Sequence, residues 1–139
     1  MILHADRYFE HRYDVTMDLL SVQWPTIETI YLPEIFHSVS ILVENVFNYN
    51  IRNLLIDASH ARIQATHEEA NQVVHLLVNG LAKSRLEKLA RIESENQNRE
   101  IMLRVMAADM NRNLGFETRF FKDIETAQNW LKNGSKLQL

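Results

Sequence analysis

The segment Asp57-Ala58-Ser59-His60 brings together three residue types that catalyse nucleophilic reactions in many enzymes. It follows the apolar run 54–56, so it should lie at the carboxyl end of a strand, where open α/β sheets tend to bind ligands. A Ser/His/Asp triad, however, needs residues that converge from separate elements, with an oxyanion hole beside them. Neighbours along an extended segment point to alternate sides and cannot form that relay. A polar turn is therefore the favoured interpretation, and we assign no catalytic residue.

Metal and cofactor motifs are incomplete. The run His67-Glu68-Glu69-Ala70-Asn71 begins like the helix of zinc proteases, which needs a second histidine one turn after the first. Asn71 occupies that position, and the loss of one ligand removes the site. The chain has 3 glycines, too few for a phosphate-cradling loop, and no nucleotide-binding fingerprint. We therefore predict no metal and no cofactor.

A candidate loop site for a ligand or partner remains at the ends of the predicted strands. It comprises Trp24, Asp57, Ser59, His60 and Asn96. If these loops form the active site of a small enzyme, a pocket with a strongly shifted titratable group should lie near His60. No set of residue types meets the geometric demands of a named mechanism, so a binding role is favoured.

The amino-acid composition and net charge exclude several classes of protein. The 139 residues are 46% hydrophobic and 24% charged, which is ordinary for one globular domain. The absence of cysteine excludes disulfides and thiolate sites, and it fits a reducing compartment. The net charge of −3 comes without a basic stripe, so we expect no nucleic-acid partner. The apolar stretches are too short to cross a bilayer and no signal peptide is visible, which predicts a cytoplasmic protein without a membrane partner.

The spacing of apolar residues predicts the strands and helices that carry these candidate residues. Alternating and aromatic residues predict a β-hairpin over 8–13 and 19–24. Pro33 suits the first turn of a helix that runs to residue 50. Thr66 and Glu69 form a capping box at the start of the next helix. Further strands are expected over 54–56, 86–93 and 116–121, and further helices over 101–110 and 123–134.

The third predicted helix should turn one apolar side inward, formed by Ile101, Met102, Val105, Met106 and Met110. The whole pattern predicts an α/β fold with a mixed, mostly parallel sheet in the order β-β-α-β-α-β-α-β-α. We expect a single domain over 1–139, with its core at about 8–132 and a frayed tail at 133–139.

Three stretches carry a family resemblance: Leu20 to Trp24, Asn53 to Asp57, and Gly115 to Asp123, followed by Ala127 and Trp130-Leu131. With the order of elements, they resemble the SpoIIAA-like (STAS) domains of anti-sigma-factor antagonists. The likeness is greatest to small stand-alone bacterial members of uncharacterised function, and it covers roughly residues 8–132. It implies a SpoIIAA-like fold and a signalling role.

The phosphorylation motif of that family is absent. The resemblance implies a phosphorylatable serine in an Asp-Ser-Ser-Gly stretch that opens the helix after the third strand. This chain has residues 63–68 there, and Thr66 is the hydroxyl at the helix start. Thr66 and Ser59 are the possible phospho-acceptors, since the positive end of a helix favours a phosphate. The alternative, that Thr66 only caps the helix, is favoured because helices prefer such caps.

The sequence therefore predicts a non-enzymatic signalling or binding module, with a protein partner or a small apolar ligand. The alternative is a small enzyme or ligand-binding protein that uses the loops at the strand ends. Tyr8, Phe9 and Tyr13 could place an aromatic strand at a sheet edge, and such an edge invites pairing between copies. We expect a homodimer on that basis.

Overall fold

A computed structural model describes residues 1–24, 32–62, 65–110 and 115–133. Of the tail predicted over 133–139, Asn133 is the last residue of the final helix, and residues 134–139 lie outside the described residues. The elements follow the order β1 (Ile2–Ala5), β2 (Glu10–Asp14), β3 (Leu19–Gln23), α1 (Leu32–Asn48), β4 (Asn53–Asp57), α2 (His67–Leu81), β5 (Lys88–Ile92), α3 (Gln97–Met110), β6 (Glu117–Phe121) and α4 (Ile124–Asn133).

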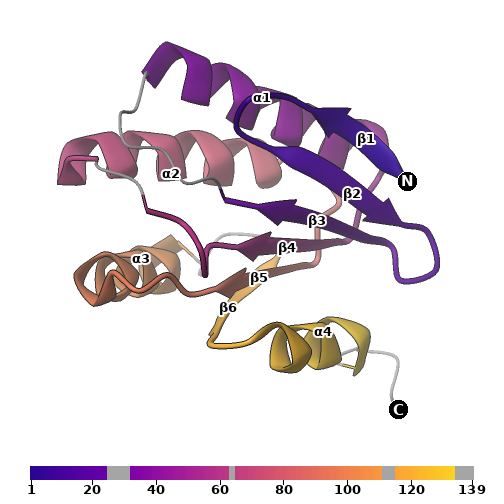
Figure 1. Ribbon diagram of the computed structural model, residues 1–139. Coiled ribbons are helices and arrows are strands. Elements are labelled where there is room, and N and C mark those ends of the chain that lie inside the picture. The colour runs from indigo at the N-terminus through magenta and orange to yellow at the C-terminus, as the bar shows by residue number, and fades with distance from the viewer. Residues whose placement is uncertain (25–31, 63–64, 111–114, 134–139) are drawn as a thin grey trace.

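The described strands form one six-stranded sheet in the order β1-β2-β3-β4-β5-β6 (Figure 1). The first three are antiparallel, and β3 to β6 are parallel. Each parallel crossover moves one place in the same direction, so right-handed connections put their helices on the same face. The predicted fold class, mixed and mostly parallel, is confirmed.

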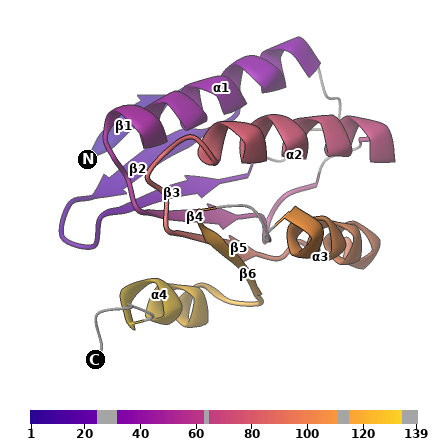
Figure 2. The ribbon, with the colours of Figure 1, turned by 180° about the vertical axis from the view of Figure 1, so that it is seen from behind.

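The two faces of the sheet bury alternate residues. Leu54 and Ile56 of β4 belong to the core beneath α1 and α2, whereas Leu55 packs on the opposite face with Ala127 and Leu131 of α4. Figures 1 and 2 show α1 and α2 on one side of the sheet and α4 on the other. This alternation follows from the period of two along a strand.

The edge of the sheet differs from the prediction. The pattern of residues 8–13 suggested an aromatic edge strand, but β1, which the sequence analysis missed, occupies that edge. Tyr13 lies in β2, the second strand, and Tyr8 and Phe9 are buried in the core. The argument for a dimer through these aromatic residues is therefore wrong, although the oligomeric state itself stays a prediction.

The first two helices pack closely. Ile35, Val39, Leu42 and Val46 of α1 are buried at helical spacing, as predicted. At Gly80 of α2, an added Cβ would lie 2.4 Å from Val43 Cγ1. Only a residue without a side chain lets the two helices approach this closely.

Helix α3 buries much less apolar surface than α1 and α2. Among its described residues, Leu103 is the only buried apolar side chain. Ile101 and Val105, predicted to face inward, are 54% and 56% exposed, and that part of the prediction is wrong. Met102 and Met106 are half-buried, and the side chain of Met110 lies outside the described residues.

The side-chain caps follow the sequence. The Glu69 N–H donates to Thr66 Oγ1 at 3.1 Å, and the Thr66 N–H donates to Glu69 Oε1 at 2.8 Å, which confirms the capping box of α2. Asp123 accepts from the Thr126 N–H at 2.8 Å at the start of α4, also as predicted. Each such cap stabilises its helix by about 1 kcal/mol.

Candidate functional site

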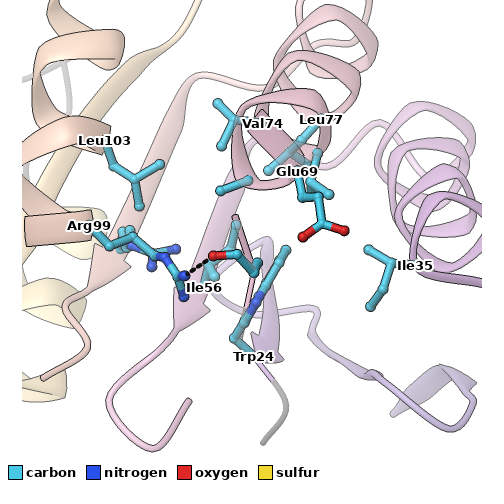
Figure 3. Close-up of a pocket in the computed structure, with 12 residues that line it drawn as sticks. Trp24, Ile35, Ile56, Glu69, Val74, Leu77, Arg99 and Leu103 are labelled. Carbon is cyan, nitrogen blue, oxygen red and sulfur yellow. Dashed lines mark hydrogen bonds between the residues drawn. The ribbon is translucent and has the colours of Figure 1, made fainter. Parts of the chain in front are cut away.

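An apolar cavity of about 80 Å³ lies between α2 and α3, over the carboxyl half of β4 and β5 (Figure 3). Its walls come from helices α1, α2 and α3, from strands β4 and β5, and from the segments that follow β3 and precede α2. The lining residues are Trp24, Ile35, Ile56, Ala65, Glu69, Ala70, Val73, Val74, Leu77, Arg91, Arg99 and Leu103. Most of this surface is aliphatic, and charged side chains enter it only as Glu69, Arg91 and Arg99.

A second space of about 70 Å³ adjoins the first and extends toward β6. Both are lined by Ile56, Val74, Leu77, Arg91 and Leu103. A cavity of roughly 150 Å³ is known to hold benzene. Each of the two spaces is smaller than that, so a ligand as large as benzene would need both of them. Apolar concavities with a few polar groups are the usual form of small-molecule sites.

The cavity exists because α3 does not fill the face of the sheet below it. The inward positions of β5 and β6 under α3 include Arg91 and Thr118 instead of large aliphatic residues. From α3 itself, Leu103 and Ala107 reach into the second space. Interiors are normally packed to crystal-like density, so an apolar space at this position is a feature to be explained.

Arg91 is the most unusual residue of the site. It faces inward from β5, with Ile56 of β4 and Phe120 of β6 as its register partners. Its Nε and Nη2 donate to the two carboxylate oxygens of Glu100 at 2.9 and 3.0 Å. Ser94 Oγ donates to the same carboxylate at 2.6 Å. Two parallel charge-assisted bonds fix the plane of the guanidinium.

Glu100 is fully buried on α3 and ionised. Burial by itself raises the pKa of this carboxyl, but the hydrogen bonds and charge of Arg91, with the hydrogen bonds from Ser94, outweigh burial and lower the pKa. A further ion pair joins Glu93, just after β5, to Arg104 of α3. Helix α3 is thus held to the sheet mainly through charged groups.

The cavity wall carries a second guanidinium. Arg99 Nη2 donates to the carbonyl oxygen of Ala65 at 3.3 Å, just before α2 begins. In Figure 3, Glu69 extends toward Ile35, on the other side of the cavity from Arg99. The guanidinium of Arg99 therefore lies apart from the carboxylate of Glu69.

The predicted loop site is only partly brought together. Trp24 lines the cavity and packs edge-on against Phe9, with ring centroids 4.9 Å apart. Asp57, Ser59, His60 and Asn96 are not among the cavity's lining residues.

These four residues lie in local structures. Ser59 donates its N–H and its hydroxyl to Asp57 Oδ1, at 2.9 and 2.6 Å, which forms the polar turn favoured above. Asn96 accepts the Arg99 N–H at 3.0 Å and caps α3. His60 is exposed and has an interaction of its own. Their part in a ligand or partner site stays a prediction.

Sequence reasoning missed Arg91, Arg99 and Glu100 as site residues. A signal was present in the strand predicted over 86–93, because its alternation places Leu89 and Arg91 on the same face. A charged residue at such a position is almost never buried without a partner.

The described residues offer neither a cluster of metal-ligating side chains nor a membrane-spanning helix. No group of three His, Asp or Glu side chains in the described part of the chain is placed to hold a metal ion. The predicted absence of metal and cofactor remains a prediction. Within the described ranges, none of the helices combines the length and apolar character needed to span a bilayer.

The fold and site define an α/β protein with an apolar cavity on the face of its sheet covered by α1, α2 and α3. The fold is shared with the crystal structure of an uncharacterised protein from the DUF3478 family, with a SpoIIAA-like fold, from Shewanella loihica PV-4. The two chains superpose with a TM-score of 0.55 and 20% sequence identity, over 94% of this chain and 90% of the other. No family model and no curated protein matches the sequence. The resemblance to the SpoIIAA-like fold is therefore confirmed at the level of structure.

Proposed function

We propose that the protein is a non-enzymatic binding module that holds a small, largely apolar ligand between α2 and α3. The observation that carries this proposal is the aliphatic cavity over β4 and β5 with its continuation toward β6. An unfilled apolar space lowers the stability of a protein core, because the side chains around it lose packing contacts. A space that holds a ligand has a function that offsets this cost.

The proposal agrees with one of the two partner classes expected from the sequence, a small apolar ligand. It also supports a role for Trp24, the one member of the predicted loop site on the cavity wall. A small enzyme that uses the strand-end loops remains the alternative. A protein partner, a homodimer and a cytoplasmic location are further expectations that the cavity does not bear on.

The test uses 1-hexanol as a probe, with binding followed by two-dimensional NMR of the labelled protein. We expect saturable shifts confined to residues of the cavity, and a loss of affinity of at least tenfold in Val74→Phe. Val74 lines both spaces, so the added ring occupies the volume that the ligand needs.

The matched control is Val105→Phe, which adds the same ring at an exposed position of α3 outside both spaces. It should bind the probe like the unmodified protein. Equal affinity of Val74→Phe and the unmodified protein would show that the cavity is not the binding site.

A signalling switch at Thr66 is a second candidate, supported by its position. Thr66 is exposed at the positive end of α2, and Arg99 is bonded to the adjacent Ala65 carbonyl. A phosphate at this position would find a helix N-terminus and a nearby guanidinium. Phosphopeptide mapping of the protein from its native cells checks this: modification at Thr66 or Ser59 supports the switch, and complete mapping without phosphate at either contradicts it.

A further inference from the structure

The cavity wall includes a buried arginine, Arg91, and the chemistry of this side chain restricts the kind of ligand that fits. Arg91 lines both apolar spaces, and its side chain is 15% exposed. Its position between Ile56 and Phe120 on the covered face is one that an aliphatic residue would fill without cost. Burial of a guanidinium among aliphatic side chains is expensive unless each of its donors is used.

Arg91 does not use all of its donors within the protein. Nε and Nη2 are bonded to Glu100, and among the described residues Nη1 has no hydrogen-bond partner. The bidentate pair holds the guanidinium in one plane, so Nη1 is fixed in space with two N–H groups. Arginine has donors and no acceptor, so these N–H groups, which are not among the buried atoms that lack a partner, can bind an acceptor oxygen of water or of a ligand.

The two carboxylates beside the cavity both accept hydrogen bonds within the protein. Both oxygens of Glu100 accept bonds from Arg91, and one of them also accepts from Ser94. The carboxylate of Glu69 accepts from the Thr66 N–H within the capping box. Arg99, whose Nη2 is bonded to the Ala65 carbonyl oxygen, is a second guanidinium on the same lining.

We infer that the ligand is an amphipathic monocarboxylate whose head binds at Arg91 Nη1, with Arg99 beside it, and whose short tail fills the two apolar spaces. A carboxylate accepts charge-assisted bonds from a guanidinium, which are stronger than those accepted by a neutral hydroxyl. The combined space is about as large as a cavity that holds benzene, and it suits a short tail such as the five-carbon alkyl chain of hexanoate. This inference rests on the proposed binding function.

The experiment compares three probes of equal length: hexanoate, 1-hexanol and hexylammonium, each titrated into the full chain by NMR at neutral pH. Hexanoate is expected to bind at least tenfold more tightly than 1-hexanol, and hexylammonium most weakly. In Arg91→Lys, the ammonium can still pair with Glu100 but has no second arm to face the cavity. This variant should bind hexanoate at least tenfold more weakly and 1-hexanol as before.

Arg104→Lys is the matched control. Arg104, on α3, also forms an ion pair with a carboxylate, that of Glu93, but it lines neither space. It should leave both affinities unchanged. If Arg91→Lys does not fold, Arg99→Met, which keeps the Arg91–Glu100 pair, should still weaken hexanoate selectively.

Two results overturn the inference, and they are distinguishable. If 1-hexanol binds as tightly as hexanoate, the cavity still binds an apolar ligand, but the inference that this ligand carries a carboxylate is wrong. Absence of binding by all three probes removes the proposed function together with the inference.

Discussion

Two regions cover the same face of the sheet in different ways. Helices α1 and α2 bury rows of aliphatic side chains and approach each other closely at Gly80. Helix α3 buries one apolar side chain among its described residues and is held by Arg91–Glu100 and Glu93–Arg104. Aliphatic packing fills space, whereas ion pairs fix a position without filling it. The contrast explains why the cavity lies beside α3.

The largest expected effect is at the buried ion pair. Glu100→Leu leaves Arg91 without its partner, and breaking a buried pair in this way costs about 3–5 kcal/mol. Urea unfolding measures this loss, and hydrogen exchange should show that α3 loses protection first. The double variant R91L/E100L should recover most of the stability, because apolar side chains replace both charges.

Glu95→Leu is the surface control for that comparison. Glu95 pairs with Arg62 at 3.4 Å, and both side chains are more than two-thirds exposed. Exposed pairs contribute about 0–1 kcal/mol. Similar losses in Glu95→Leu and Glu100→Leu would show that the buried pair does not hold α3.

The next effect concerns a buried histidine beneath α1. His11 is fully buried, its Nδ1 lies 2.9 Å from Asn45 Nδ2, and its Nε2 has no partner among the described residues. Burial, and then the charge of His4, lowers the pKa of His11 from 6.5 to about 4, while Asp6 opposes the shift. The His4 ring lies 5.0 Å away.

The sign of the pH dependence follows from that pKa. Between about pH 6.5 and pH 4 the unfolded chain binds a proton at His11 that the folded chain excludes. Stability therefore falls as the pH is lowered through this window, by roughly 2–3 kcal/mol from this group. Urea unfolding at several pH values should show a shallower fall in His11→Gln. The exposed His75→Gln serves as control, and equal slopes in His11→Gln and the unmodified protein would contradict the assignment.

The smallest effect tests the close packing of α1 and α2. Gly80→Ala gains helix propensity of about 1 kcal/mol but forces Val43 away, and overpacking costs about 1–3 kcal/mol. We expect a net loss of about 1 kcal/mol in thermal or urea unfolding. Adding Val43→Ala should remove the penalty of the clash, giving a favourable coupling in the double-mutant cycle. Asn79→Ala, exposed on the same helix, should be neutral or slightly stabilising, and a Gly80→Ala variant that behaves in the same way would refute the close contact.

Local features were predictable because their causes lie within a few residues. The Thr66–Glu69 capping box and the Asp123 cap depend on side chains three residues from the backbone groups they bind. The spacing of Val39, Leu42 and Val46 shows which side of α1 is buried. The class of fold followed from the alternation of such elements.

Helix α3 shows where periodicity fails. Its apolar residues are spread around the helix, so no one side stands out, and Ile101 and Val105 were wrongly placed inward. The short edge strand β1 was missed because it has no buried face of its own; its pattern is set by pairing with β2.

Residue patterns alone predicted the existence of the helices, the side-chain caps of α2 and α4 and the mostly parallel character of the sheet, because these depend on local hydrogen bonds and on the period of apolar residues. The inward direction of Arg91 and its pairing with Glu100 on the following helix became visible only in the folded chain. Their pairing requires the chain to turn back at Ser94 and lay α3 over β5, and no spacing rule encodes that return. The cavity has the same origin, since an unfilled volume is a property of how elements meet and not of any one of them.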